Sequence, residues 1–385
     1  MGTELTRRGH TVRLAAPRGQ QRLCEQAFAG TGVGLLPAPE LAPSATRLKY
    51  PCTYPDLLHD CGYASPGNVS AAVGGWLRLF DSYAPDLLIA DHSPTSLLAS
   101  RLRSHATLAT GTGFACPPDF SPQPSLRAEI PQPHWGEVVE QKVLEAMNWA
   151  MDQHRAPPLS RVTEIFATLD ARPLLTFKAI DHYADWRAQE ASPPDYWQPF
   201  GTLPGAPCDW PRGPRIAPNS PRVFVYLRDP STETPLLRGL AYKRIATVCY
   251  SARMSEAERE QFAGSSVLIS PSLMVLAPLL EGCTVAVLHG GHGFVSLLML
   301  AGVPMVLVPK SLEQRVTAEK ICQLGVGLQA QEGDLNGLGA ALEQLLEDGS
   351  YRDRSAALSG ALGGQDERAA LHEFVDAAEG TLAAR

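Results

Sequence analysis

Residues 285–309 carry the sequence VAVLHGGHGFVSLLMLAGVPMVLVP. Two short apolar runs flank a glycine-rich turn, His289-Gly290-Gly291-His292-Gly293, and an apolar segment of helical length. This order predicts a strand, a tight turn, a helix and a second strand. Glycines at a strand end let the backbone approach a ligand closely, and the first amides of the following helix attract an anion such as phosphate. We therefore predict a diphosphate site at this turn, to which the histidine at the strand end donates a further hydrogen bond.

Length and composition indicate a globular protein with room for two domains. The chain has 385 residues, of which 44% are hydrophobic and 19% are charged, and its net charge is −7. These fractions argue against disorder, and the acidic balance argues against a general nucleic-acid-binding protein. No apolar run has transmembrane length, and the N-terminal residues lack the pattern of a secretory signal. The eight cysteines are scattered, without zinc-ligand spacing, so we expect free thiols, no metal site and a cytoplasmic location.

Strand and helix patterns alternate along both halves of the chain. This alternation predicts an α/β fold with two doubly wound parallel sheets. Between the halves, residues 191–221 contain nine prolines in irregular sequence, which is typical of a linker. We predict an N-terminal domain over residues 1–214, a C-terminal domain over 215–365, and a terminal helix within 366–385 that packs back on the N-terminal domain.

The glycine turn and the residues after it resemble the donor-binding signature of the GT-B glycosyltransferases, in particular the UDP-glycosyltransferase superfamily with its bacterial macrolide and natural-product members. The matching residues are His289-Gly290-Gly291-x-Gly293, Ala301-Gly302-Val303-Pro304, Pro309, Glu313-Gln314 and Ala318. Order and spacing hold over about thirty residues, whereas a glycine turn alone would be weak evidence. The resemblance implies the GT-B fold, in which two Rossmann-like domains face a cleft, and a nucleotide-diphosphate sugar bound to the C-terminal domain.

The resemblance also assigns parts of this donor site. It implies that His289 and the turn amides hold the diphosphate, and that Glu313 and Gln314 face the sugar hydroxyls. Pro271 belongs to the segment that lies under the base in the family. Arg228 follows the first strand of the second half, where the family contacts phosphate or acceptor, although a loop arginine is more often solvated.

Three positions at the donor site depart from the family pattern, and a fourth stays undecided. Phe294, which we include in the donor site by position, replaces the threonine that starts the helix. Leu297 replaces the ribose-binding glutamate and Ile269 the base-stacking tryptophan, and the loss of stacking costs roughly 1–3 kcal/mol. We expect a retained diphosphate clamp with altered base and ribose recognition, which fits a different nucleotide such as dTDP, a different set of contacts, or lost affinity. His292 either donates to the diphosphate or faces solvent.

In the N-terminal half, Asp91 ends a buried strand at residues 87–90. This position resembles that of the family's catalytic aspartate, which orients a histidine that deprotonates the acceptor hydroxyl. On the residues alone, Asp91 is equally well explained as a capping or loop aspartate. The neighbouring His92 either acts as a base or only packs.

The family's catalytic histidine has no counterpart in this sequence. It lies in a Gly-His-x-x-Pro turn after the first strand, and this chain starts within the helix that follows, with the match Glu4-Leu5-x-x-Arg8-Gly9-His10. A misassigned start codon is the expected cause. Because the missing strand is central in such a sheet, we expect unpaired strand edges beside its place.

We predict an inverting, metal-independent transferase that moves a hexose from a UDP- or dTDP-sugar to a hydroxyl of a small acceptor. We expect no separate cofactor, no nucleic-acid or membrane partner, and a monomer or homodimer. Because the usual histidine is absent and the ribose contacts differ, a non-catalytic nucleotide-sugar-binding protein is the alternative. A sugar-nucleotide epimerase is a third possibility on the same fold.

Overall fold

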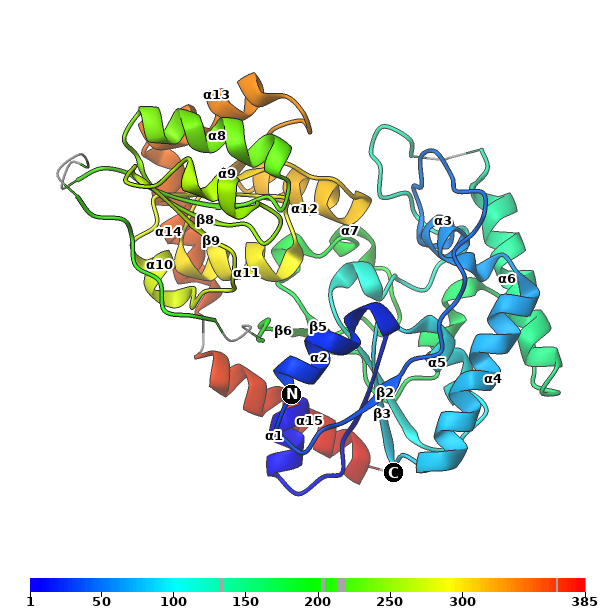
Figure 1. Ribbon diagram of the computed structural model, residues 1–385. Coiled ribbons are helices and arrows are strands. Elements are labelled where there is room, and N and C mark those ends of the chain that lie inside the picture. Colours follow the sequence, from blue (N-terminus) through cyan, green and yellow to red (C-terminus); the bar gives the residue numbers. More distant parts are fainter. Residues whose placement is uncertain (132–133, 202–204, 214–215, 217–218, 365, 385) are drawn as a thin grey trace. The chain divides into compact units, whose positions relative to one another are not determined.

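Contacts between residues divide the chain, seen here in a computed structural model, into two units (Figure 1). The first unit comprises Met1–Phe200 and Asp366–Arg385, and the second comprises Gly201–Gln365. The structure describes residues 1–131, 134–201, 205–213, 216, 219–364 and 366–384. The predicted domain boundary between residues 214 and 215 lies outside the described residues. The chain's last segment belongs to the first unit.

The second unit is built on a six-stranded parallel sheet of order β12-β11-β10-β7-β8-β9. Its strands are β7 Arg222–Tyr226, β8 Ala246–Tyr250, β9 Val267–Ser270, β10 Val285–Leu288, β11 Met305–Leu307 and β12 Gly327–Gln329. In the numbering of this unit alone, the order is that of a Rossmann sheet, 3-2-1-4-5-6. The strand order therefore reverses between β7 and β10, which are paired in parallel.

Helices cover both faces of this sheet. They are α8 Pro230–Tyr242, α9 Glu256–Glu260, α10 Ala277–Glu281, α11 His292–Ala301, α12 Leu312–Gln323, α13 Leu335–Glu347 and α14 Ser350–Leu362. Helices α8 and α13 pack on one face, against Val223, Val225 and Val287. Phe224 points to the opposite face, where its ring stacks on Phe294 of α11 at 5.3 Å between centroids. Every residue of β10 is buried, as expected for a parallel strand covered on both faces.

Helix α14 has no counterpart among the predicted elements. Its sequence, SYRDRSAALSGAL, lacks an apolar stripe of helical period, so periodicity does not mark it. In the structure α14 packs beside α11, and the hydroxyl of Ser359 donates to the carbonyl of Leu300 at 2.6 Å. Tertiary contact with an apolar neighbour therefore stabilises this helix.

The first unit contains three separate two-stranded parallel ladders. They are β1 Arg13–Ala16 with β2 Gly34–Pro37, β3 Leu87–Asp91 with β4 Ala106–Thr110, and β5 Leu174–Leu175 with β6 Tyr196–Trp197. An isolated bridge joins Leu108 to Ala171. Within the described residues, β1 pairs only with β2, and β3 pairs with β4 alone. In the described part of the chain, each of these two ladders therefore has a strand edge without a ladder partner.

Helices of the first unit enclose a large apolar core. They are α1 Gly2–Arg7, α2 Gln21–Ala27, α3 Tyr54–Leu58, α4 Pro66–Tyr83, α5 Pro94–Ser100, α6 Gly136–Asp152, α7 Ala184–Arg187 and α15 Glu367–Ala383. Met147 and Met151 of α6 are fully buried against α4, whereas Trp149 of the same helix is exposed. Among the described residues, no helix is long and apolar enough to cross a membrane.

Residues 159–168 form little regular helix. Only a short 3₁₀ helix, Val162–Phe166, forms there. The side-chain amide of Asn148 bonds both backbone groups of Leu159, accepting from its N–H at 2.7 Å and donating to its carbonyl at 3.0 Å. Because these backbone groups are already satisfied, a helix does not start at residue 159.

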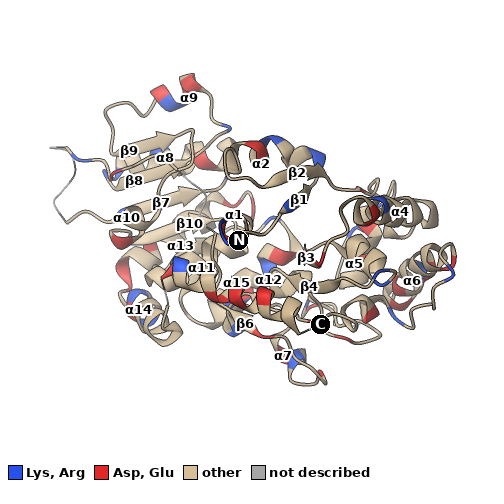
Figure 2. Ribbon diagram, turned by 90° about the horizontal axis from the view of Figure 1, so that it is seen from below, with Lys and Arg blue, Asp and Glu red and all other residues tan. Residues whose placement is uncertain are grey.

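The terminal helix α15 packs on the first unit through one apolar face and one charged face. Phe374 is 1% exposed and contacts the core around Leu108, and its ring meets Phe200 at 5.3 Å between centroids. On the charged face, Arg8 of the N-terminal segment donates to Glu379 at 2.8 Å. The acidic positions of α15 are visible beside α1 in Figure 2.

We expect Phe374→Ala to lower the free energy of unfolding by about 3–5 kcal/mol, because it leaves a cavity under α15. Tyr242→Ala is the matched control, since this aromatic side chain is 89% exposed; its effect should stay within about 0.5 kcal/mol. Urea denaturation followed by circular dichroism measures both changes. Equal effects of the two substitutions would show that α15 is not docked.

Candidate functional site

The glycine turn lies where the strand order of the second unit reverses. Strands β10 and β7 are neighbours and parallel, so the loops that follow them leave the same edge of the sheet. The turn follows β10 directly, and helix α11 begins at His292. Doubly wound sheets bind their ligands at this place, beyond the carboxyl ends of the strands on either side of the reversal.

The backbone of the turn requires glycine at position 290. Gly290 has φ +93°, and a Cβ at this residue would lie 3.2 Å from the backbone oxygen of Gln314. The carbonyl of Gly291 caps α11, accepting from the amides of Phe294 and Val295 at 3.1 Å each. The amides of the first helical turn point along the axis beyond the helix end. Gly291 and Gly293 are exposed, so an anion can approach these amides.

His289 is oriented by a bond to the neighbouring strand. Its Nδ1 lies 2.8 Å from the carbonyl oxygen of Val308. Because a carbonyl only accepts, Nδ1 carries a proton and Nε2 is the atom left for a ligand. Burial lowers the pKa of this half-buried imidazole, so the ring is neutral near pH 7. A neutral Nε2 accepts rather than donates, so an anion at the turn gains a hydrogen bond from His289 only as the ring takes up a proton.

The next two side chains in the turn are those of His292 and Phe294. Both pack against the protein. His292 is 5% exposed, so it does not face solvent. The ring of Phe294 packs against Phe224 and lies 5.7 Å from Tyr226 between centroids. Phe294 therefore belongs to an aromatic cluster on the sheet face.

Gln314 and Glu313 lie at the start of α12, next to the turn. The Gln314 side chain accepts from the backbone N–H of Lys310 at 2.8 Å, and the Gln314 backbone lies against Gly290. Glu313 is half-buried. Pro271 lies in the exposed turn that follows β9, two strands away from β7. Glu313 and Gln314 thus lie close to the glycine turn in the structure, whereas Pro271 follows the far edge strand.

Three charged residues that the motif does not contain surround the same sheet edge. Lys310 follows β11, and its Nζ lies 2.8 Å from Asp229 Oδ2 and 3.0 Å from Glu332 Oε1. Asp229 also caps α8, accepting from the Ser231 amide at 3.2 Å. Lys310 holds the pKa of Asp229 well below its usual range. Although partial burial opposes it, pairing with both carboxylates raises the pKa of Lys310.

Arg228 precedes this cluster in the loop after β7. It is exposed and has φ +52°, a left-handed conformation that is rare outside glycine. Such backbone conformations cost about 1–2 kcal/mol and recur at ligand-binding loops. The sequence motif did not predict that Asp229, Lys310 and Glu332 lie together. Their positions could have indicated it, because each of them follows a strand within a few residues.

In the first unit, Asp91 ends β3 and lies over the loop that follows β4. A Cβ at Gly111, whose φ is +116°, would come within 2.6 Å of Asp91 Oδ1. Asp91 as a residue is exposed, but the protein around its carboxyl group displaces part of the hydrating water. This desolvation raises the pKa of the carboxyl. His92 has φ +44°, and desolvation lowers its pKa, so it is neutral near pH 7. Both side chains thus favour the uncharged form more than they would in water.

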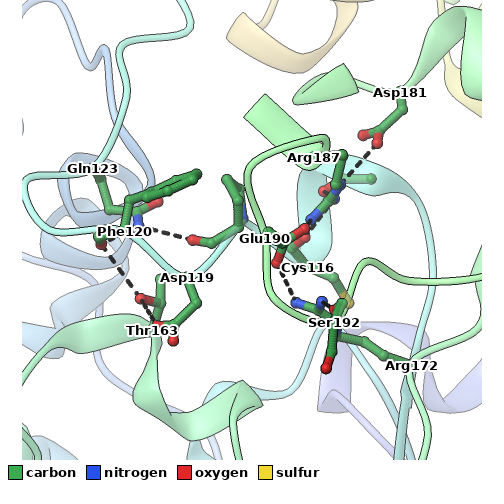
Figure 3. A network of polar contacts seen from close by, with 12 residues as sticks. Cys116, Asp119, Phe120, Gln123, Thr163, Arg172, Asp181, Arg187, Glu190 and Ser192 are labelled. Atoms are coloured by element: carbon green, nitrogen blue, oxygen red, sulfur yellow. Dashed lines mark hydrogen bonds and ion pairs between the residues drawn. The ribbon is translucent and has the colours of Figure 1, made fainter. Parts of the chain in front are cut away.

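A buried ionic network fixes the loop that contacts Asp91 (Figure 3). Arg187 is 3% exposed and donates to the carbonyl of Cys116 at 2.7 Å and to Asp181 at 2.9 Å. Glu190 bridges Arg187 to Arg172, at 3.2 Å and 2.9 Å. Because these charges are paired inside the unit, loss of any one partner leaves an uncompensated buried charge. The network keeps the segment after β4 rigid beneath Asp91.

Residues 269–366, which include the glycine turn, match the family described as Erythromycin biosynthesis protein CIII-like, C-terminal domain. Several solved structures are similar along the length of the chain. The calicheamicin glycosyltransferase CalG4 is 20% identical, with a TM-score of 0.71, over 98% of this chain and 93% of CalG4. The chain has the GT-B fold.

Two further structures share this fold. The glycosyltransferase of kitacinnamycin is 17% identical, with a TM-score of 0.68, over 98% of this chain and 93% of its own. The glycosyltransferase VinC, solved in complex with dTDP, is 17% identical, with a TM-score of 0.67, over 98% and 94% of the two chains. No curated protein sequence matches the chain.

We expect Gly290→Ala to destabilise the second unit by about 1–2 kcal/mol, because a side chain at a left-handed φ is strained and here also meets the Gln314 carbonyl. Gly339→Ala is the control, since Gly339 lies inside α13 with open space around it. In that helix alanine should stabilise by up to about 1 kcal/mol. Shifts of the same sign in thermal unfolding would contradict the strained turn.

Proposed function

We propose that the chain transfers a hexose, with inversion, from a UDP- or dTDP-sugar to a hydroxyl of a small acceptor. The observation that carries this proposal is the glycine turn at the strand reversal of a Rossmann sheet, inside the segment that matches the family. The dTDP bound to VinC and the thymidine diphosphate bound to SsfS6 support a nucleotide diphosphate as the donor half. The calicheamicin and spinosyn glycosyltransferases support a natural-product acceptor.

In this proposal the second unit stabilises the leaving group. When the bond from the anomeric carbon to the diphosphate breaks, negative charge grows on the diphosphate oxygens. The amides at the start of α11 and the positive end of its dipole meet that charge without reorganising. His289 adds a charge-assisted hydrogen bond from Nε2 once it is protonated. In this proposal these groups stabilise the leaving group without a metal ion.

The first unit supplies the base. An acceptor hydroxyl that attacks the anomeric carbon must lose its proton, and we assign the proton to Asp91. Its raised pKa makes this carboxylate a stronger base than an ordinary aspartate. The neutral His92 beside it is the second group that can take the proton. Asp91 thus carries the role that the family divides between an aspartate and a histidine.

We place the reaction in the cytoplasm. All eight cysteines lie within the described residues and are free thiols, which suits a reducing compartment. The proposed donor and acceptor are small water-soluble or amphiphilic molecules that need no membrane partner.

A nucleotide-sugar-binding protein without turnover is the second candidate. Ile269, at the position of the family's base-stacking tryptophan, packs partly buried against the core on the α8 and α13 face. It therefore offers a nucleobase no aromatic surface at that position. Weak base recognition combined with an intact diphosphate turn would suit binding without efficient catalysis.

Two substitutions test the two parts of the proposed site, the diphosphate turn and the base. His289→Gln should weaken dTDP or UDP binding by about tenfold to a hundredfold, because a hydrogen bond to a charged group is lost. Asp91→Asn should leave binding unchanged and lower transfer by about 10²–10⁴-fold, because only the base is removed. Calorimetry measures binding, and mass spectrometry of products from dTDP-glucose or UDP-glucose with a panel of hydroxylated acceptors measures transfer.

The wild-type results decide between transfer, binding alone and a different reaction. Wild-type binding without transfer or donor hydrolysis would establish the binding-protein alternative. Recovery of an epimerised donor would instead establish the epimerase. Full affinity in His289→Gln would refute the diphosphate assignment.

The affinity for dTDP-glucose should fall as pH rises from about 6 to about 8. Free His289 has a lowered pKa, and a bound diphosphate raises it, so binding takes up a proton and is favoured at lower pH. The sugar ester is the suitable ligand because its diphosphate has no group that titrates in this range. In His289→Gln the slope should vanish, and a slope that persists would assign the proton uptake to another residue.

A further inference from the structure

In the sheet of the second unit, four neighbouring strands are each followed by a charged or titratable residue at the same edge. In the sheet order β12, β11, β10, β7, the residues that follow are Glu332, Lys310, His289 and Asp229. Lys310 bridges the two carboxylates at 2.8 Å and 3.0 Å. The charges of Lys310, Asp229 and Glu332 all act on the His289 ring, so the four residues form one electrostatic group. We call this group the edge cluster.

The edge cluster presents a conflict for an anionic ligand. Asp229 and Glu332 place two negative charges at the edge where the diphosphate is proposed to bind, and like charges repel a phosphate at this range. Lys310 is the cation between them. Its side chain is 33% exposed, and a lysine ammonium on four rotatable carbons can change partner without moving the backbone. Asp229, in contrast, is fixed because it caps α8 through Ser231 and Thr232.

We propose that Lys310 binds the donor diphosphate and that Asp229 and Glu332 hold it in the absence of ligand. This inference rests on the proposed function. When the diphosphate arrives at the turn, the ammonium exchanges carboxylate partners for a phosphate oxygen. The two carboxylates therefore compete with the ligand for Lys310.

A purely structural role for the ion pair predicts different results. If Lys310 only ties the loop after β11 to the start of α8, removal of either partner loosens the same edge. Both substitutions would then weaken ligand binding. The phosphate-binding role predicts opposite signs, since removal of Lys310 removes a cation and removal of the Asp229 charge frees one.

The experiment measures dTDP, UDP and inorganic pyrophosphate binding to the full chain by isothermal titration calorimetry. Lys310→Gln should weaken the binding of each of these by about tenfold or more, as for loss of one charged hydrogen bond. Asp229→Asn should strengthen binding severalfold, and it keeps the helix cap because asparagine caps as well as aspartate. Lys243→Gln is the matched control, because Lys243 forms an exposed pair with Glu343 on α8 and α13 and does not belong to the edge cluster. Its affinity should equal that of the wild type.

Each alternative outcome has one meaning. If the folded wild type binds none of the three probes, the proposed function itself fails. If the wild type binds, His289→Gln weakens binding, and Lys310→Gln matches Lys243→Gln, the inference about Lys310 is overturned while the function stands. Weaker binding in both Lys310→Gln and Asp229→Asn would establish the structural role and also overturn it. Should Lys310→Gln not fold, Asp229→Asn decides alone, and unchanged or weaker affinity contradicts the proposal.

Discussion

Parallel pairing of β10 with β7 and β11 is the constraint on which the candidate donor site depends. It places the ends of these strands on one edge, so residues far apart in the sequence meet there. It also sets the register that brings the carbonyl of Val308 to Nδ1 of His289 at 2.8 Å. That single bond decides the tautomer of the ring, and the tautomer decides whether Nε2 can donate to an anion. A backbone register thereby controls the protonation chemistry of the site.

The electrostatics of this edge are balanced rather than simply positive. The helix dipole of α11 favours an anion, and its favourable effect is typically about 0.3–1 kcal/mol for one charge at an exposed helix end. Two carboxylates at the same edge oppose it. Lys310 and a protonated His289 shift this balance towards binding. Lys310 can exchange its carboxylate partners for a phosphate oxygen, and His289 can gain or lose a proton. A site of this kind binds a diphosphate without holding it permanently, which suits a group that must leave after each transfer.

The sequence was sufficient to predict the α/β class, the alternating elements of the second half and the turn at residues 289–293. The apolar pattern of a strand and the glycines of a turn involve only neighbouring residues. They therefore predict local structure without knowledge of the tertiary contacts. Helix α14 was not predictable in this way, because its stability comes from contact with α11 and not from its own periodicity. The ion pairs of Lys310 with Asp229 and Glu332 were missed for a related reason. Strand ends are visible in the sequence, but Asp229 and Lys310 become neighbours only through the order in which the strands pair, which a single sequence does not specify.

The residue proposed as the base illustrates why a shared fold does not by itself establish an activity. Asp91 lies at a strand end with a raised pKa, as a base requires, yet the first unit has open edges at β1 and β3 within the described residues. A base must be held still to act, and two features hold Asp91 in place. The ladder to β4 fixes its backbone beside Thr110, and the network of Arg187, Asp181 and Glu190 fixes the loop against which its carboxylate lies. Both contacts lie on the β4 side of β3, so they fix the position of Asp91 independently of the opposite edge of that strand.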